Sequence, residues 1–180
     1  MKRIVCTTLL VETSPQAMPL GAACIASAIK ADPRTAGAFS VELRDFSLED
    51  GALAACRTDG EKAVYIARAL AGSGAGGLSA VCFSVYVWNH RLLEAAAREL
   101  KKLIPGLVCI AGGPEVTANP LVFSAFDYTI AGQGEGAVPA LLSELFLQED
   151  GRPAPRPDSG ALWGLPLASW QTLQARQPPK

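Results

Sequence analysis

Four short segments rich in glycine, proline and small polar residues could together hold a large ligand. They are TSPQAMPLG (13–21), SVYVWN (84–89), AGGPEVTANP (111–120) and GQGEG (132–136). Each follows or ends a short apolar run of the kind that forms a buried strand. In an open parallel sheet, ligands bind beyond the carboxyl ends of the strands, which lie along one edge. We therefore expect the four segments to form one binding site.

The residue types in these segments suit a large, mostly apolar ligand. Ser84 offers a hydroxyl at a strand end, and Tyr86 and Trp88 add aromatic surface. Gly112 and Gly113 would let the backbone approach the ligand closely. Each feature also has a purely structural explanation, since a Gly-Gly pair often makes a tight turn and an aromatic pair often belongs to a core. The prediction therefore rests on their convergence at one edge.

Other chemistries lack their motifs. His90 is the only histidine, which excludes a multi-histidine zinc site, and there is no G-x-S-x-G segment. Neither a P-loop nor a G-x-G-x-x-G segment after the first strand is present, which disfavours a nucleotide-binding Rossmann domain. The cysteines form neither C-x-x-C nor C-x-x-x-C-x-x-C, so we expect free thiols and no iron–sulfur cluster in this chain. They are Cys6, Cys24, Cys56, Cys82 and Cys109.

Strand and helix patterns alternate along the chain. Apolar runs predict strands at 3–11, 39–46, 78–87, 107–113 and 127–132. Helices are predicted at 19–32, 61–72, 89–104 and 134–147, with a short helix or helical turn within 117–126. In the third helix we expect Asn89 to cap the N-terminus through its side chain, and Glu94 and Arg98 to form an i, i+4 pair.

This alternation predicts a flavodoxin-like (Rossmann-like), doubly wound α/β fold with a five-stranded parallel sheet. The strand order 2-1-3-4-5 is expected from the fold type. Residues 1–147 would form this domain. Residues 148–180, whose first part is rich in proline and glycine, would form a linker or tail.

Composition narrows the possible partners and location. Hydrophobic residues make up 49% of the chain, enough for a core, and the net charge of −1 gives no drive towards nucleic acid. No apolar stretch has the length of a transmembrane helix, and the N-terminal run does not fit a signal peptide. We expect a cytoplasmic protein that binds neither nucleic acid nor membrane.

Four segments carry a resemblance to a known family. FSVYVWN, IAGGPEVTANP and DYTIAGQGEGAVPALL, with MPLGAACIASAIK near the start, resemble the N-terminal cobalamin-binding domain of cobalamin-dependent radical SAM proteins over residues 1–147. The resemblance implies a bound cobalamin. We expect the cofactor-binding residues to be Pro19, Leu20, Gly21, Ser84, Val85, Tyr86, Trp88, Asn89, Gly112, Gly113, Pro114, Glu115, Gly132, Gly134 and Glu135.

The resemblance also implies how these positions would act. Ser84, Val85 and Tyr86 match the strand-three element that lines a channel for the dimethylbenzimidazole tail of the cofactor. Gly112 and Gly113 match glycines that let this tail pass. The corrin ring would then lie over the strand ends, facing the place where a catalytic domain docks.

The sequence departs from related patterns in three places. Methionine-synthase-type domains carry D-x-H-x-x-G after the first strand, and its histidine ligates cobalt; residues 12–21 hold no histidine, so we predict no histidine ligand from this loop. Gln133 stands where many relatives have glutamate. A radical SAM enzyme continues into a barrel with the cysteine triad that this chain lacks, so we do not expect a complete enzyme.

Three functional hypotheses follow. The first is a cobalamin-binding module whose partner is a radical SAM or methyltransferase domain, in cis in a longer protein or in trans. The second is a degenerate flavodoxin-like interaction domain that no longer binds a cofactor. The third is a flavin-binding or receiver-like domain. A receiver is disfavoured because TTLLVETS carries no acidic cluster and SVYVWN carries no aspartate, and flavin binding has no phosphate-binding loop to support it.

Overall fold

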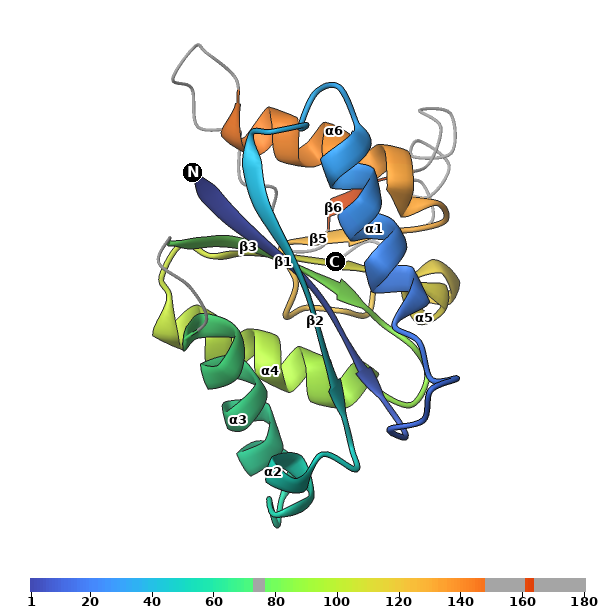
Figure 1. Cartoon of the computed structure of the whole chain (residues 1–180), viewed down its shortest axis with the longest axis vertical. Coiled ribbons are helices and arrows are strands. Elements are labelled where there is room, and N and C mark those ends of the chain that lie inside the picture. Colours follow the sequence, from blue (N-terminus) through green and yellow to red (C-terminus); the bar gives the residue numbers. More distant parts are fainter. Residues whose placement is uncertain (73–76, 148–160, 164–180) are drawn as a thin grey trace, which may run out of the picture.

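One parallel sheet forms the centre of the molecule (Figure 1). The computed structural model describes residues 1–72, 77–147 and 161–163. Its first strands run in the order β2-β1-β3-β4-β5, which confirms the predicted flavodoxin-like α/β fold and strand order. They are β1 (Lys2–Leu10), β2 (Phe39–Ser47), β3 (Leu78–Ser84), β4 (Val108–Gly112) and β5 (Tyr128–Ile130).

A sixth strand, β6 (Ala161–Trp163), extends the sheet beyond β5. It lies within the segment 148–180 that the sequence predicts as linker or tail. Three residues are too few for periodicity to separate a strand from a loop, so the pattern does not indicate it. Because β6 is parallel to β5 and Trp163 pairs with Ile130, it ends at the carboxyl edge of the sheet. The domain boundary after residue 147 stays a prediction.

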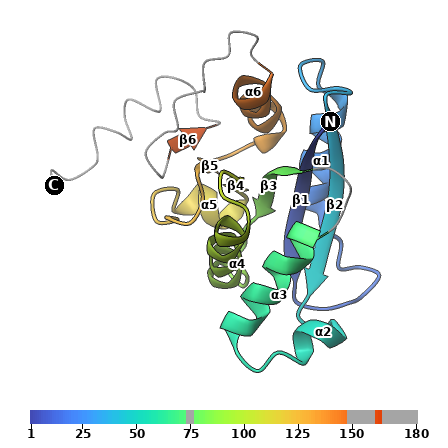
Figure 2. The ribbon, with the colours of Figure 1, turned by 90° about the vertical axis from the view of Figure 1, so that its left-hand side faces the viewer.

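Helices cover both faces of the sheet (Figures 1 and 2). Helices α1 (Leu20–Ala31) and α6 (Gly134–Phe146) pack on one face, and α3 (Asp59–Gly72) and α4 (His90–Leu103) on the other. Within the described residues, no helix has the length and apolar character needed to cross a membrane.

Two short helices complete the described part of the chain: α2 (Gly51–Ala54) and α5 (Pro114–Ala118). The prediction of a helix within 117–126 is wrong in position, because α5 starts directly after β4 and residues 119–126 are turns and bends. Pro114 accounts for this start, since a proline in the first turn has its φ preset for a helix and lacks only an N–H that would be unpaired there.

Side chains of alternate strand residues separate into two cores. On β1, Val5 and Leu9 face α3 and α4, whereas Ile4 and Cys6 face α1 and α6. An apolar stripe on α4 packs into the first of these cores: Leu93, Ala96, Ala97 and Leu100 are fully buried, and Ile104 just after the helix is partly buried. The Glu94–Arg98 ion pair is also present, at 3.2 Å. The sheet thus has one packed layer of helices on each face.

The side chain of Asn89 joins the ends of β1 and β3, where these strands diverge. It is 0% exposed. Its Nδ2 donates to the carbonyl of Leu9 at 3.1 Å, to Thr8 Oγ1 at 3.3 Å and to the carbonyl of Ser84 at 3.4 Å. Its Oδ1 accepts the N–H of Tyr86 at 2.8 Å. The expected side-chain cap of α4 is therefore wrong: Asn89 precedes the helix, but its oxygen is used by the preceding loop.

Thr7 and Thr8 are neighbours on β1, but only the Thr8 hydroxyl forms a hydrogen bond within the described residues. Thr8 Oγ1 donates to the carbonyl of Ser84 at 2.9 Å, whereas the buried Thr7 Oγ1 has no partner among the described residues. We expect Thr7→Val to raise the free energy of unfolding by about 1 kcal/mol, because valine keeps the shape and removes an unpaired hydroxyl. Thr8→Val should lower it by about 1–3 kcal/mol. Urea unfolding measures both, and shifts of the same sign would contradict this assignment.

Candidate functional site

A pocket of about 250 Å³ opens at the carboxyl edge of the sheet, between α1 and α6. Strands β3, β4 and β5 supply its floor, the two helices supply its walls, and the loops after the strands supply its mouth. The lining residues are Gly21, Ala22, Ile25, Cys82, Phe83, Ser84, Tyr86, Ile110, Gly112, Gly113, Pro114, Ile130, Gly132, Gln133, Gly134, Glu135 and Val138.

Strand register orders this lining from floor to mouth. Cys82 pairs with Ile110 in the inner row, and Ser84, Gly112 and Ile130 form the next row towards the carboxyl edge. These residues share one face because alternate strand residues point to the same side. The inner part of the pocket is therefore apolar, and polar groups appear towards its mouth.

Two hydroxyl groups face this mouth. A Cβ placed on Gly21 would lie 2.9 Å from Tyr86 Oη and 3.1 Å from Ser84 Oγ, so both hydroxyls lie against the first turn of α1. Both residues line the pocket. Within residues 1–72 and 77–147, neither hydroxyl has a hydrogen-bond partner. They are thus available to a bound molecule.

Trp88 covers the outer face of Tyr86. The two rings stack with centroids 4.7 Å apart and planes 10° from parallel. Trp88 is 50% exposed, and its Nε1 donates to the carbonyl of Leu9 at 3.2 Å. The structure therefore gives the carboxyl edge an anchored aromatic surface, with Tyr86 in the pocket and Trp88 outside it.

Gly113 allows two backbone segments to cross. Its φ is +112°, and a Cβ there would lie 2.5 Å from the carbonyl oxygen of Val85. Gly112 differs, because a Cβ there would meet Ile130 at an ordinary 3.7 Å. Gly112 thus leaves open volume in the pocket, while Gly113 permits the packing of the loop that follows β4.

Other glycines of the predicted site serve helix packing or a turn. A Cβ on Gly134 would lie 2.8 Å from Ile25 Cδ1, so this glycine lets α6 approach α1. Gly132 has a φ of +84° with open space around its Cα. Its role is a left-handed turn between β5 and α6.

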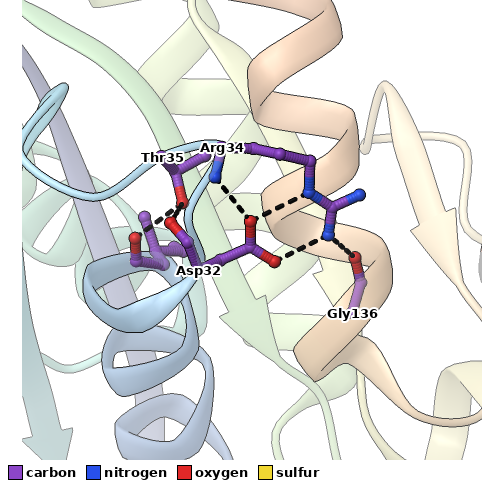
Figure 3. A network of polar contacts seen from close by, with 5 residues as sticks. Asp32, Arg34, Thr35 and Gly136 are labelled. Carbon is purple, nitrogen blue, oxygen red and sulfur yellow. Dashed lines mark hydrogen bonds and ion pairs between the residues drawn. The ribbon is translucent and has the colours of Figure 1, made fainter.

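A polar bridge ties together the two helices that form the pocket walls (Figure 3). Arg34, just after α1, donates from Nη2 to Asp32 Oδ2 at 2.6 Å and to the carbonyl of Gly136 in α6 at 3.2 Å. Its Nε donates to Asp32 Oδ1 at 2.9 Å, and Thr35 Oγ1 donates to the carbonyl of Ile29 at 2.7 Å. These bonds fix the end of α1 against the first turn of α6.

His90 lies at the same sheet edge but outside the pocket lining. Its Nδ1 is 3.9 Å from Glu115 Oε1, and both side chains are partly exposed. His90 also packs edge-on against Phe123, with ring centroids 6.4 Å apart. In the described part of the chain, no group of three or more His, Cys, Asp or Glu side chains is arranged to hold a metal ion.

The predicted site residues fall into two groups. The pocket lining includes Gly21, Ser84, Tyr86, Gly112, Gly113, Pro114, Gly132, Gly134 and Glu135. The other predicted residues lie outside the lining. Pro19 precedes α1 and Leu20 begins it, Val85 is buried in the core on the opposite face of the sheet, and Trp88 stacks on Tyr86. Asn89 is buried beneath the loop that follows β3, and Glu115 faces His90. Ligand contact by any of these residues stays a prediction.

Sequence reasoning missed the apolar floor. Cys82 lies two residues before Ser84, and Ile110 lies two residues before Gly112, so each shares a face with a predicted site residue. The sequence could have indicated Cys82 and Ile110, because each lies two residues before a predicted site residue on the same strand. Ile25 and Val138 had no comparable signal, because helix packing brings them to the pocket.

Comparison with known proteins gives limited information. No family model matches the chain. A curated relative, the 2-(S-pantetheinyl)-carbapenam-3-carboxylate methyltransferase of Streptantibioticus cattleyicolor, is 40% identical over 68 residues. The aligned segment covers 36% of this chain and 10% of that methyltransferase. The chain is thus similar to a small part of a much longer methyltransferase.

Gly113→Ala and Gly112→Ala should separate the two glycine roles. We expect Gly113→Ala to lower the free energy of unfolding by about 1–3 kcal/mol, because a side chain at this φ would also clash with the backbone of Val85. Gly112→Ala should leave it within about 1 kcal/mol of the wild type. Chemical denaturation of both variants checks this, and a Gly112→Ala loss as large as that of Gly113→Ala would contradict it.

The Asp32–Arg34 bridge predicts a pH-dependent contact. Side-chain and backbone hydrogen bonds from Arg34 lower the pKa of Asp32 from 3.8 to about 2. Because the folded pKa is the lower one, the bridge stabilises the fold above pH 3.8, and this stabilisation is lost as the pH falls towards 2. NMR titration of the Asp32 carboxyl should give a pKa well below 3.8, which Arg34→Gln should restore towards that value. An unchanged pKa in Arg34→Gln would contradict the bridge.

Proposed function

We propose that this chain is a cobalamin-binding module that presents the cofactor to a methyltransferase or radical SAM partner domain. The observation that carries the proposal is the pocket at the carboxyl edge. It combines an apolar floor, the space left by Gly112 and the hydroxyls of Ser84 and Tyr86, which have no hydrogen-bond partner among the described residues. Ligands of open parallel sheets bind at this edge.

The size of the pocket limits which part of the cofactor enters. Pockets that enclose a whole drug-sized ligand measure about 300–1,000 Å³, and this one measures about 250 Å³. It suits a flat bicyclic base and not a corrin ring. We therefore place the dimethylbenzimidazole tail in the pocket, with Ser84 or Tyr86 donating a hydrogen bond to its ring nitrogen. The corrin would lie outside, over the strand ends.

The surface beside the pocket mouth is suited to an apolar ring system. Val87 is 68% exposed and Trp88 is 50% exposed in the loop after β3, and Leu20 is 64% exposed at the start of α1. Exposed apolar side chains gathered near a pocket mark ligand or partner contacts. These residues would lie against the corrin or against the partner domain above it.

When bound, cobalamin supplies a cobalt ion that can carry a methyl or related group. The loop from residue 11 to residue 19 contains no histidine. His90 lies instead beside Glu115 and Phe123, outside the pocket lining. We therefore expect the lower face of the cobalt to lack a histidine ligand from this loop, and assign His90 no ligating role.

The partner assignment rests on the relative. That protein is a methyltransferase, and the segment similar to this chain is 10% of its length. A module of this kind would not catalyse transfer by itself. The partner domain would provide the substrate site and the chemistry of group transfer.

Mixing the purified chain with hydroxocobalamin and removing free ligand tests the proposal. We expect retained corrin absorbance in the visible spectrum of the protein. Ser84→Tyr and Gly112→Leu should weaken binding about tenfold or more, because each new side chain fills the pocket. Electron paramagnetic resonance of the cob(II)alamin form should show no axial nitrogen.

Two controls match these variants. Gly112→Ala is the control for Gly112→Leu, because it adds only a methyl group at an ordinary contact distance. Ser27→Tyr is the control for Ser84→Tyr, because it makes the same change at an exposed position of α1 outside the pocket lining. Both should retain cobalamin, with circular dichroism confirming the fold of every variant. No corrin on the wild type would refute the proposal and favour an interaction domain without cofactor. Equal binding by the pocket-filling variants would refute the site.

A further inference from the structure

We propose that the floor of the pocket selects corrinoids by their lower base, accepting benzimidazoles and rejecting purines. This inference rests on the proposed function, because it requires the nucleotide tail to enter the pocket. It goes further by assigning a specificity to named residues of the floor. The observation behind it is the separation between an apolar inner row and polar groups at the mouth.

The inner row offers almost no hydrogen bonding to a ligand. Its strand residues are Cys82 and Ile110, which are direct partners in the β3–β4 register. Ile25 from α1 and Val138 from α6 close this part of the pocket. Of these side chains, Cys82 alone carries a group that could form even a weak hydrogen bond.

The Cys82 thiol already has a partner. Cys6 on β1 is the register partner of Cys82 on β3, and both side chains face the same core. The hydrogen bond with Cys6, followed by burial, raises the pKa of Cys82 well above its ordinary value. The thiol therefore stays neutral, and because a neutral thiol is only a weak donor and a weak acceptor, it gives a polar group of a ligand little hydrogen bonding.

Hydroxyl groups are available only nearer the mouth. Ser84 lies two residues closer to the carboxyl edge than Cys82, and Tyr86 lies in the loop beyond it. Both hydroxyls lie against Gly21, at the first turn of α1. The pocket can thus satisfy a polar atom at the outer end of a bound base, but not one at the inner end.

Benzimidazole and adenine bases differ at that inner end. Both are flat bicyclic systems of similar size, joined to the ribose through the five-membered ring, so the six-membered ring enters first. In dimethylbenzimidazole this ring carries methyl groups, whereas in adenine it carries two ring nitrogens and an amine. The pocket volume does not separate the two bases, but the polarity of the floor does.

The expected discrimination is at least about tenfold in the dissociation constant. Leaving one buried amine or ring nitrogen without a partner costs enough to produce a factor of this size. Because adenine would bury several such atoms, tenfold is a lower bound on the selectivity.

Three ligands test the inference on the unmodified chain: cobalamin, the cobamide with an adenine base, and cobinamide, which has no base. Dissociation constants come from spectrophotometric titration of each. We expect cobalamin to bind at least about tenfold more tightly than either of the others. Equal binding of cobalamin and the adenine cobamide would overturn the inference and leave the proposed function standing. Failure of all three ligands to bind would overturn both.

Cobinamide separates the remaining cases. If it binds as tightly as cobalamin, the tail contributes nothing, so neither the tail placement nor the selectivity would stand. If cobinamide binds weakly and the two cobamides bind equally, the tail enters but the floor does not discriminate, which overturns the inference alone.

A matched pair of variants tests the residue assignment. Ile110→Thr adds a hydroxyl to the floor of the pocket. Ile110→Val puts a side chain of nearly the same shape as threonine there, but without the hydroxyl. We expect Ile110→Thr to reduce the preference for cobalamin over the adenine cobamide by about threefold or more, because one polar atom of adenine gains a partner. Ile110→Val should keep the wild-type preference. Equal ratios in both variants would exclude Ile110 as a determinant of selectivity.

Discussion

The buried amide of Asn89 holds the carboxyl edge of the sheet in shape. At this edge β1 and β3 stop pairing, so their backbone groups turn to side chains for hydrogen bonds. Asn89 bonds the carbonyls of Leu9 and Ser84 and the N–H of Tyr86 with a single side chain. Ser84 and Tyr86 line the pocket, and Leu9 also accepts the indole N–H of Trp88. The positions of the hydroxyls and of the aromatic pair thus depend on one fully satisfied amide.

Glycines and the Arg34 bridge determine how closely the walls approach this edge. Gly21 and Gly134 let helices α1 and α6 pack against strand and helix side chains, while Arg34 ties the end of α1 to the first turn of α6. Gly112 leaves volume within the pocket, and Gly132 has open space around it at the pocket mouth. The glycines of the predicted site therefore have different physical roles: some permit close packing or a turn, and others leave open space.

The structure brings many of the predicted site residues together at one pocket, but it gives some of them other local roles than the sequence suggested. Ser84, Tyr86 and Gly112 meet at one pocket, as expected for residues at the ends of adjacent parallel strands. Asn89 was expected to cap a helix, but its oxygen accepts a loop N–H instead. The helix after β4 begins earlier than its apolar pattern indicated, because Pro114 starts it. The first error arises because the Asn89 amide has several possible partners close to it, and sequence alone does not choose among them.

Sequence alone determined the strands, their parallel arrangement and the edge of the sheet at which the four glycine-rich segments meet, because the periodicity of each segment and the direction of the chain can be read locally. It did not determine the depth or polarity of the pocket. The inner row of Cys82 and Ile110 depends on the register between β3 and β4, and the walls depend on how α1 and α6 pack. The neighbouring thiols of Cys82 and Cys6 also come from residues far apart in the chain. Only tertiary structure decides such contacts, since they require distant segments to be placed within bonding distance.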